Sequence, residues 1–597
     1  MTKTACGLDC YDACSILVEE GEVFKIKGDA NHPVGTGALC SFLNKQMFDA
    51  ARIEKPTING KEVSMEKAMQ AVAEAFKEKE SLLWRGSGNF SVMQEVTNLF
   101  MQKIDGYLTK GSLCDGAGDA GIVSGRGVNR TLSPEEIGEA DVVVVWGRNI
   151  TVTNAHLMPF LEGKEIVVID PVKTAIAKQA KIHLQIKPRT DYYIAVMLSR
   201  FIFMEDSEDA EWMEEYASEY EDFYDYTREH RIKPILAHIG ITLGDMGKVL
   251  EIMRGKKVVF LVGAGVQKYT IGSYVTHAID SLAATLGLFG KKGCGVSYLG
   301  NSKLGLENPF EVSCKRVQKA VTPFSDFHTV LIQGGNPAAS MPDSNRVISE
   351  LKEVKNLIYF GLYENETSCL ANIIIPAKNF FEKDDVRLSY GHHYIEEMHK
   401  VIDTEIGISE YAFTRRLFDS FGFDGLEDEA YYIEQWLKQC NKEENRYSSP
   451  AYDATPYAEG FGEEKEDEFV FIDEFDDNFV NTKRFRRYRK ERKDKTEEVI
   501  FWLLTSKSKK SLNTQFQREE VVHLHSGLGY AEGEKVIVSS EHGEHRFVIK
   551  LNDDLREDCV LITNNTIGVN YLTPSIVSEE GDNACYQEVK VSIKREA

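Results

Sequence analysis

Four cysteines near the N-terminus are the side chains in this sequence best suited to bind a metal centre. Cys6, Cys10 and Cys14 follow a C-x3-C-x3-C spacing, and Cys40 follows after 25 further residues. Three close thiolates and a distant fourth suit an iron–sulfur cluster, because the local three can wrap one face of it. Zinc also accepts four cysteines, although its sites usually present two short knuckles. The spacing therefore predicts a cluster, with zinc or unrelated thiols as the alternatives.

The elements that must position these cysteines are short. Residues 15–18 and 23–26 are apolar runs on either side of an acidic glycine turn. Such a pattern predicts a small hairpin that holds the cysteine site.

Composition limits the class of protein. The 597 residues are 42% apolar and 27% charged, which is enough for a large core in several domains. The net charge of −24 argues against nucleic acid as the main partner, because phosphate binding needs a basic surface. No apolar run reaches membrane-spanning length, and the N-terminus has no apolar signal core, so we expect a cytoplasmic protein without direct membrane insertion. The 11 cysteines fit reduced thiols.

Several apolar, β-branched runs end in glycine or polar turns, as in a parallel sheet. The runs at 141–146, 166–169, 257–262, 330–333 and 357–360 predict buried strands. Strand, glycine turn, helix, strand and acidic residue is the order of a dinucleotide-binding unit, although G-x-G-x-x-G is absent. Ordinary turns are the alternative to phosphate-binding ones. The candidate cofactor-binding residues in these turns are Gly147, Arg148, Asn149, Asp170, Gly263, Gly265, Gly335 and Asn336.

The last third of the chain changes character twice. Residues 425–498 are rich in charge and predict a linker or surface insertion. Its basic run at 483–493 could dock an acidic partner or form a solvated face. From residue 499 onward, short strands separated by glycine or asparagine turns predict a small barrel.

Together these motifs resemble the molybdopterin oxidoreductases, the family of formate dehydrogenase, nitrate reductase and dimethyl sulfoxide reductase. The resemblance spans nearly the whole chain in the family's order. Beyond the cysteines it rests on Gly28-Asp29-x2-His32-Pro33, Gly147-Arg148-Asn149, Asp170-Pro171, Pro188-x-Thr190-Asp191, Gly335-Asn336-Pro337, Glu366-Thr367, Thr505-Ser506 and Val569-Asn570.

The resemblance implies a multidomain α/β fold. A small iron–sulfur β-domain would precede Rossmann-like parallel-sheet domains around a central cofactor crevice, and a six-stranded β-barrel would follow. The boundaries we expect are 1–55 for the iron–sulfur domain, 56–130 with 325–424 for one α/β domain, 131–324 for the Rossmann-like domain, 425–498 for the charged linker and 499–597 for the dinucleotide-binding barrel.

The resemblance also implies cofactors and site residues. The family holds molybdenum or tungsten between two molybdopterin guanine dinucleotides, next to one 4Fe-4S cluster bound here by Cys6, Cys10, Cys14 and Cys40. The metal commonly takes a protein ligand, and the matching position is Cys114, whose soft thiolate suits such a centre. Asp115 is the second candidate. The further cofactor-binding residues implied are Thr190, Asp191, Thr505, Ser506 and Asn570.

Other polar residues could serve a substrate. His156 is our candidate for proton transfer, and the pair His392 and His393 is available for the same role, although each of these histidines could be structural. Arg126 and Arg148 could face an anionic substrate or cofactor phosphates.

The sequence departs from the family's pattern at two positions. The family often has a lysine two residues after the last cluster cysteine, where this chain has Phe42; the nearest lysine is Lys45. Arg189 replaces a glycine that is usual in the family, and it could help hold a phosphate.

We expect the catalytic subunit of a two-electron oxidoreductase that acts on a small substrate. Its electrons would pass through the cluster to a ferredoxin-like or iron–sulfur electron-transfer subunit. One alternative is a cluster-bearing structural subunit that lacks the metal. The other is a non-redox hydratase or lyase that uses the metal as a Lewis acid.

Overall fold

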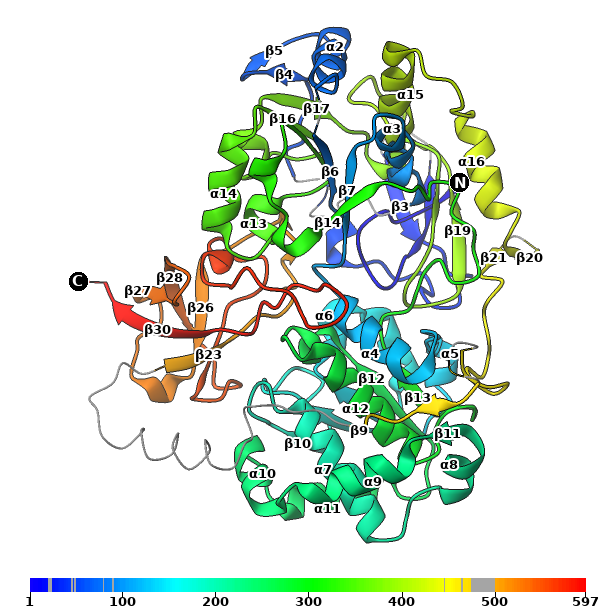
Figure 1. Cartoon of the computed structure of the whole chain (residues 1–597), viewed down its shortest axis with the longest axis vertical. Coiled ribbons are helices and arrows are strands. Elements are labelled where there is room, and N and C mark those ends of the chain that lie inside the picture. Colours follow the sequence, from blue (N-terminus) through cyan, green and yellow to red (C-terminus); the bar gives the residue numbers. More distant parts are fainter. Residues whose placement is uncertain are drawn as a thin grey trace.

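Two parallel sheets form the centre of the molecule (Figure 1). The computed structural model describes residues 1–596 except 20–23, 44–46, 48–49, 79, 88–90, 445, 463–464, 466 and 474–499. The described part of the predicted linker includes a helix and several short strands, and the basic run at 483–493 lies outside the described residues.

The five-stranded sheet is wholly parallel, in the order β10-β9-β8-β12-β13. Its central β-branched strands are buried on both faces, because alternate residues enter two different cores. Val142 and Val144 pack toward the long helices α7 and α12, whereas Val143 and Val145 pack toward η3. The strands are β8 (Val142–Trp146), β9 (Glu165–Ile169), β10 (Ile182–Leu184), β12 (Val258–Val262) and β13 (Gly295–Ser297).

The eight-stranded sheet has the order β14-β7-β6-β15-β16-β17-β4-β5. Its first six strands are parallel, and only β4 and β5 pair antiparallel at one edge. The strands are β4 (Thr57–Ile58), β5 (Lys61–Glu62), β6 (Ser81–Arg85), β7 (Tyr107–Lys110), β14 (Lys315–Gln318), β15 (Thr329–Gln333), β16 (Asn356–Gly361) and β17 (Ile373–Pro376).

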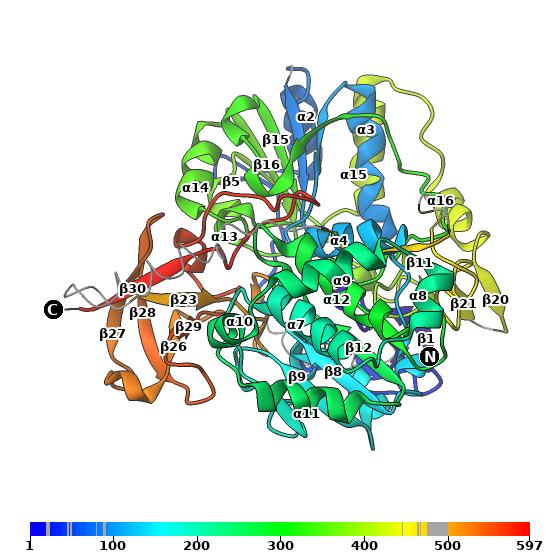
Figure 2. The same cartoon turned by 60° about the horizontal axis from the view of Figure 1, so that its bottom comes forward.

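Helices cover both sheets and fill the connections between the strands (Figure 2). They are α2 (Met65–Ala75), α3 (Thr97–Lys103), α4 (Gly116–Arg126), α5 (Pro134–Ile137), α6 (Ile150–Thr153), α7 (Asp191–Met204), α8 (Ala210–Tyr216), α9 (Tyr220–Glu229), α10 (Ile232–Ile239), α11 (Leu243–Met253), α12 (Gly272–Thr285), α13 (Pro337–Ser340), α14 (Ser344–Glu353), α15 (Glu410–Phe421) and α16 (Glu429–Leu437), with the 3₁₀ helices η3 (Ala155–Leu161) and η11 (Val569–Tyr571) among the shorter turns.

The N-terminal residues form a small antiparallel sheet, β1-β2-β3, which confirms the predicted hairpin strands. Its turn lies outside the described residues. A four-stranded sheet, β18-β19-β21-β20, lies beside it, and β1 contacts β19. The strands are β1 (Thr2–Ala5), β2 (Ser15–Glu19), β3 (Lys25–Gly28), β18 (Asp385–Arg387), β19 (Tyr394–Met398), β20 (Asn441–Glu443) and β21 (Arg446–Ser448).

The C-terminal residues form a closed six-stranded barrel, β23-β29-β26-β28-β27-β30, which projects to one side of the sheets (Figure 2). The strands are β23 (Ile500–Leu504), β26 (Val521–Leu524), β27 (Lys535–Ser539), β28 (Glu544–Leu551), β29 (Cys559–Leu561) and β30 (Lys590–Arg595). Two short pairs complete the strands: β11 (Ala217–Ser218) with β22 (Phe469–Val470), and β24 (Ser511–Leu512) with β25 (Gln515–Phe516).

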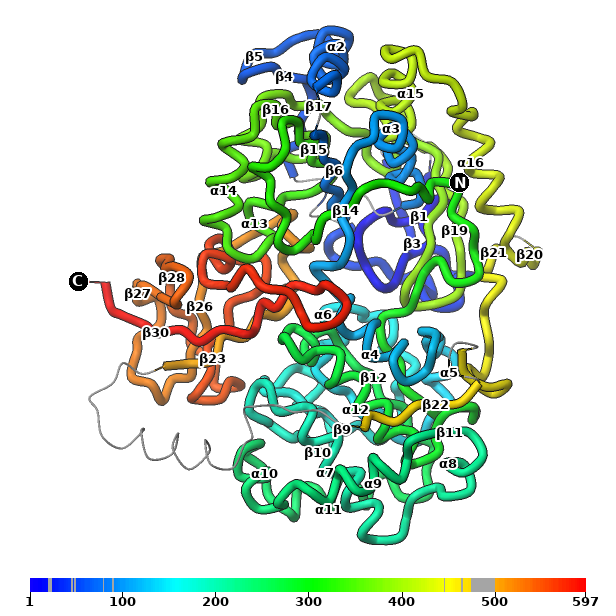
Figure 3. The backbone as a smooth tube through the Cα atoms, viewed as in Figure 1, coloured from blue at the N-terminus to red at the C-terminus, as the bar shows by residue number. Residues whose placement is uncertain are grey.

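Before its last strand the chain returns from the barrel to the centre of the molecule (Figure 3). There Asn583 forms a β-bridge with Ser112, and Gly581 packs on the start of α4. A Cβ on Gly116 would lie 2.4 Å from the carbonyl oxygen of Gly581, so only glycine permits this approach. The barrel is thereby tied to the loop that carries Cys114.

The predicted fold class is confirmed: an α/β multidomain chain with parallel sheets and a closed barrel. The strand predicted at 141–146 is observed at Val142–Trp146, and the one at 330–333 at Thr329–Gln333. After β8, residues 155–161 form the 3₁₀ helix η3, which contains Pro159. The predicted domain boundaries stay a prediction. Strand β14 falls within the range 131–324 that we expect for the Rossmann-like domain, and it pairs with β7 in the eight-stranded sheet.

Candidate cofactor site

A cavity of about 1760 Å³ lies where the carboxyl ends of the strands in both parallel sheets face the barrel. Residues that follow β8, β9, β12, β15 and β16 line it, together with the barrel loop 504–519. This is the edge at which open α/β sheets bind ligands. The volume exceeds that of a site for one drug-sized molecule.

Most of the predicted site residues meet in this cavity. Those that line it are Cys10, Cys114, Asp115, Gly147, Arg148, Asn149, Asp170, Asp191, Gly263, Gly265, Gly335, Asn336, Thr505 and Ser506.

Thr190 and Asn570 do not line the cavity. The Thr190 hydroxyl donates a hydrogen bond to the carbonyl of Lys187 at 2.6 Å, just before α7 begins. The amide of Asn570 donates to the carbonyl of Ala339 at 2.6 Å and so connects the barrel to α13. Both side chains hold neighbouring segments in place, and a direct cofactor contact has no support from their positions.

Two buried carboxyls, Asp170 and Asp191, lie at the five-stranded end of the cavity. Burial raises the pKa of Asp170 to about 7, and the charge of Asp191 adds to this effect. Burial also raises the pKa of Asp191 to about 6, against a hydrogen bond from the indole of Trp146 at 2.8 Å. The main chain of Val172 donates to Asp170 at 2.8 Å. Donors on a ligand would stabilise the ionised forms of both groups.

Close backbone contacts and one arginine complete this end. A Cβ on Gly263 would lie 2.3 Å from the carbonyl oxygen of Gly147, so the two strand ends meet without side chains between them. Arg148 is buried, its guanidinium lies 4.6 Å from the ring centroid of Tyr11, and its Nη1 has no hydrogen-bond partner among the described residues. A buried cationic donor that lacks a partner fits an anionic ligand group.

Cys114 lies in the loop between β7 and α4, and its side chain is exposed to the cavity. The Ser112 hydroxyl oxygen accepts hydrogen bonds from the main-chain N–H groups of Cys114 and Asp115, at 2.8 and 3.1 Å. Enclosure by the cavity walls and the charge of Asp115 raise the pKa of the Cys114 thiol, whereas Lys268 and Lys507 lower it. The loop is therefore ordered around a thiol that two cations face.

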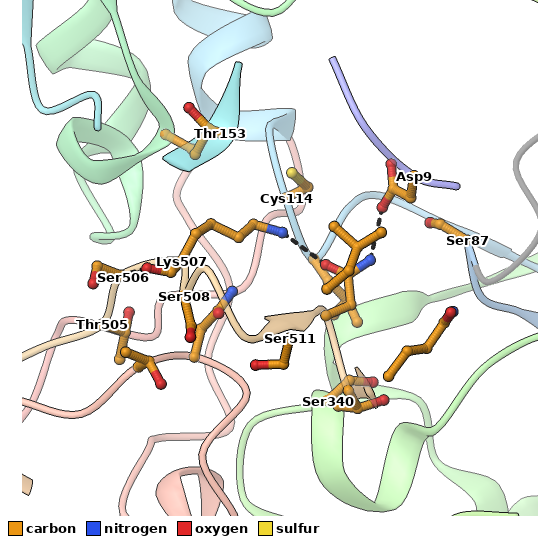
Figure 4. A pocket seen from close by; sticks show the side chains of 18 of the residues that line it. Asp9, Ser87, Cys114, Thr153, Ser340, Thr505, Ser506, Lys507, Ser508 and Ser511 are labelled. Carbon is orange, nitrogen blue, oxygen red and sulfur yellow. Dashed lines mark hydrogen bonds between the residues drawn. The ribbon is translucent and has the colours of Figure 1, made fainter. Parts of the chain in front are cut away.

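Side chains that the sequence did not single out complete the wall around Cys114. Lys268 donates to the carbonyl oxygens of Leu113 and Cys114, at 2.7 and 2.6 Å. Figure 4 shows Asp9, Cys114 and Lys507 around the same space. Lys507 donates to Asn513 at 2.7 Å, and Asn513 donates to Asp9 at 2.9 Å. The barrel loop is therefore bonded to the N-terminal cysteine loop, residues 6–14.

Lys319 is a further cation on the cavity wall that no sequence pattern marks. Its ammonium lies 5.1 Å from a ring centroid of Trp84, and burial lowers its pKa to about 8. No pattern in the sequence marks it, because it reaches the cavity from the end of an edge strand. Tyr390 was missed for the same reason: it follows β18 in a loop, and its hydroxyl lies 3.4 Å from Asp9.

The four N-terminal cysteines lie around one loop that a buried arginine holds. The guanidinium of Arg387 donates to the carbonyl oxygens of Cys6, Leu8 and Cys10, at 3.0, 3.3 and 2.9 Å. The main chain of Cys6 also donates to Cys14 at 2.9 Å. These contacts use backbone carbonyls, and none of the four thiols forms a disulfide.

The electrostatics of these thiols fit a bound cationic centre. Burial raises the pKa of Cys6 to about 12, and the charge of Cys40 adds to this effect. Burial is also the largest cause of the raised pKa values of Cys10, Cys14 and Cys40. Four thiolates gathered here need positive charge to offset their repulsion. Among the described residues, no three His, Cys, Asp or Glu side chains are placed to hold one metal ion.

His156, predicted as catalytic, does not line the cavity. It lies behind the cysteine loop, with Nδ1 2.7 Å from Asp12 and Nε2 3.1 Å from the carbonyl of Ala38 and 4.0 Å from the sulfur of Cys14. Burial lowers its pKa, but the hydrogen bond and charge of Asp12 outweigh burial, so the pKa is raised. Its contacts support a role in positioning the cysteine loop. His392 contacts the same loop, bonded to the carbonyl of Asp12.

Three further residues from the sequence analysis, Arg126, Arg189 and Phe42, lie in different surroundings. Arg126 is buried in a pair with Asp280, away from the cavity. Arg189 pairs with Glu588 at 2.7 Å and has a φ of +65°, a conformation that favours the glycine usual there. Phe42 lines the cavity and stacks on Phe516, with centroids 5.7 Å apart, whereas Lys45 lies outside the described residues.

No described helix is long and apolar enough to cross a membrane.

Comparison with known proteins agrees with this architecture. The sequence matches the molybdopterin oxidoreductase family over residues 52–407. It is 25% identical to the probable oxidoreductase YoaE of Bacillus subtilis, over 67% of this chain and 65% of that protein. It is 24% identical to a formate dehydrogenase subunit alpha of Methanocaldococcus jannaschii, over 64% of this chain and 63% of that protein. The chain thus spans less than two thirds of the length of either curated relative.

A solved structure shares the whole fold. Acetylene hydratase from Pelobacter acetylenicus superposes with a TM-score of 0.82 over 100% of both chains, at 13% sequence identity. Since the family match covers more than half of the sequence, this chain belongs to the molybdopterin oxidoreductase family.

Proposed function

We propose that this member of the family is the catalytic subunit of a molybdenum- or tungsten-dependent oxidoreductase, in which Cys114 binds the metal and Cys6, Cys10, Cys14 and Cys40 bind a 4Fe-4S cluster. The observation that supports this most is the meeting of a free thiol with two strand-end surfaces in one large cavity. When bound, the pterin-held metal supplies two-electron oxidation or reduction, and the cluster supplies one-electron transfer.

The residues of this chain would bind and orient two pterin guanine dinucleotides. At the five-stranded end, Asp170 and Asp191 offer carboxylates to ligand N–H or O–H groups, and Arg148 offers a donor to a phosphate. At the eight-stranded end, Gly335 and Asn336 follow β15 on the cavity wall. The barrel residues Thr505 and Ser506 would cover the ligands from the third side.

Cys114 would direct its thiolate to the metal from a loop that hydrogen bonds hold rigid. Lys268 and Gln267 both bond to the carbonyl oxygen of Cys114, at 2.6 Å each. Asp115, the second candidate ligand, is already engaged, since its carboxylate accepts the hydroxyl of Ser112 at 2.7 Å. This difference favours Cys114. A small substrate would bind on the side of Asp9 and Lys507 (Figure 4).

The electron partner we propose is a ferredoxin-like or iron–sulfur subunit that receives electrons from the cluster. A lysine between cluster and pterin is absent at Phe42, where the aromatic ring stacks on Phe516. The electron route would therefore pass an apolar contact at this position.

Exchange of one thiol tests the proposal. Cys114→Ala should lower turnover by at least about 100-fold and reduce metal retention, because the protein ligand is lost. The matched control is Cys369→Ala, which removes another exposed thiol that lines the cavity. We expect this control to leave turnover and metal content unchanged. Full activity of the complex with Cys114→Ala would instead favour a structural subunit.

A second candidate function is a metal-dependent hydratase. The full-length structural likeness to acetylene hydratase supports it, because that protein's name describes a non-redox addition of water. Turnover of substrate with no electron acceptor or donor present would select this function over the oxidoreductase.

A further inference from the structure

A second, small cavity lies beside the cofactor site and is not part of it. This side cavity has a volume of about 70 Å³ and is formed by four segments of the chain. They are residues 129–133 before α5, 300–304 after β13, 389–395 between β18 and β19, and 449–456 after β21. Its size admits a few water molecules but no nucleotide.

The walls of the side cavity hold polar atoms without partners. Asn129 Oδ1, Arg130 Nε and His393 Nδ1 are buried and have no hydrogen-bond partner among the described residues. Asn129 itself is only 5% exposed. Bound water would satisfy these three atoms, because an unpaired buried polar group is costly.

The outer end of the side cavity reaches the surface. There Arg130 and Asp453 form an ion pair at 3.6 Å, and their side chains are 37% and 30% exposed. Exposed pairs of this kind are weak, so this one can open at little cost. The ring of His393 stacks on Tyr452 at 3.6 Å, which fixes one side wall.

The inner end of the side cavity meets the cofactor site. Gly300, Asn301, Ser302 and Tyr390 line both spaces. The Tyr390 hydroxyl lies 3.4 Å from Asp9, which lines the cofactor site on the same side as Cys114. The two spaces therefore share wall residues, and Tyr390 reaches from the side cavity to Asp9 in the cofactor site.

We propose that the side cavity is a water-filled entrance through which water, and uncharged molecules of similar size, reach the substrate end of the cofactor site. This inference rests on the proposed function in one respect: bound dinucleotides would fill the large cavity and leave the side cavity as the free approach. Tyr390 and Ser302 form its inner opening.

A size-graded block of the inner opening tests the proposal in the loaded enzyme. In Ser302→Cys the introduced thiolate attacks a methanethiosulfonate, a disulfide forms and methanesulfinate leaves. The methyl reagent should leave turnover within about twofold of the untreated variant, because its methylthio adduct lacks the ring of the benzyl adduct. The benzyl reagent should lower turnover at least about fivefold, because its ring fills the opening. Unchanged turnover after full benzyl labelling would overturn the proposal.

Two controls separate this test from the proposed function. Glu307→Cys places a thiol on the adjacent exposed surface, outside both cavities, and should be insensitive to either reagent. Wild-type enzyme treated in parallel accounts for its own cysteines, and metal and iron contents of the labelled variant should equal those before labelling. Absence of metal from the unlabelled enzyme would contradict the proposed function and not the entrance.

A crystal structure that resolves water gives a readout independent of activity. We expect ordered water within hydrogen-bond distance of Asn129, Arg130 and His393. An empty or collapsed side cavity would contradict the entrance.

Discussion

The two ends of the cofactor cavity are built on the same kind of strand but treat their polar groups differently. At the five-stranded end, Asp170 and Asp191 are buried with raised pKa values, and Arg148 has a buried donor without a partner. At the eight-stranded end, Glu366 accepts hydrogen bonds from Arg518 at 2.5 Å and from Asn336 at 2.8 Å. At the five-stranded end the Arg148 donor has no acceptor among the described residues, whereas at the eight-stranded end the carboxylate of Glu366 is paired.

The difference indicates how each end would meet a ligand. Burial raises the pKa of Glu366, but the charge of Arg518 and the hydrogen bond from Asn336 outweigh it, so the carboxylate is held ionised. Its network is complete without a ligand and fixes the loop that follows β16. At the five-stranded end the hydrogen bonds to Asp170 and Asp191 do not offset their burial, and Arg148 Nη1 has no acceptor among the described residues. A ligand would supply further donors to the aspartates and an acceptor to Arg148. We therefore expect the five-stranded end to respond more strongly to mutation of its polar groups.

The largest effect should come from removing both aspartates. Asp170→Ala combined with Asp191→Ala removes the acceptors for one dinucleotide, and a hydrogen bond to a charged group contributes about 1.5–3 kcal/mol. The guanine nucleotide content of purified protein should fall from two to one per chain, as measured by release and chromatography. Asp424→Ala, at an exposed position, is the control. Retention of both nucleotides would end the contrast between the two ends.

A smaller effect concerns the stability of the cofactor-free protein. Its pH dependence should have opposite signs for Asp170 at the five-stranded end and Glu366 at the eight-stranded end. The pKa of Asp170 is about 7 in the folded chain, above the ordinary value near 3.9 of an unfolded one. The contribution of Asp170 to wild-type stability should therefore fall as pH rises from about 4 to 7, and Asp170→Asn should remove this part of the pH dependence. We compare the free energy of unfolding of the variant with that of wild type by urea unfolding. The variant's advantage over wild type should be about 1–3 kcal/mol larger at pH 8 than at pH 4.

Glu366→Gln should behave in the reverse way. The pKa of Glu366 is lowered on folding, so its ionised form stabilises the folded chain above the unfolded pKa. That contribution is lost as pH falls through the folded pKa. The variant should be less stable than wild type at pH 7 by under about 1 kcal/mol, because the Glu366 side chain is 35% exposed and solvent screens the pair. A difference that grows on acidification would contradict the ionised network.

The last effect concerns the hairpin β24–β25, whose residues line the cavity. Phe42 stacks on Phe516 at an interplanar angle of 20°. A double-mutant cycle with Phe42→Ala and Phe516→Ala should give a coupling free energy of about 0.5–1.5 kcal/mol. A coupling near zero would mean that hydrogen bonds such as those of the Lys507–Asn513–Asp9 chain hold the hairpin without this stacking contact.

The sequence predicted the strands and the residues that follow them because both depend on local pattern. Asp170 and Gly263 could be placed at one edge, since buried parallel strands end at the same side of a sheet. His156 could not be placed, because only tertiary packing brings Asp12 beside it. Lys319 and Tyr390 enter the cavity from segments without a motif. Asn570 matches a family segment, yet its amide is used to join two domains.

The central claim is that this cavity holds a pterin-bound metal with a 4Fe-4S cluster beside it. Elemental analysis of anaerobically purified, fully loaded protein tests it most directly. We predict near-stoichiometric molybdenum or tungsten and about four iron atoms per chain. Protein that contains neither molybdenum nor tungsten would contradict the account.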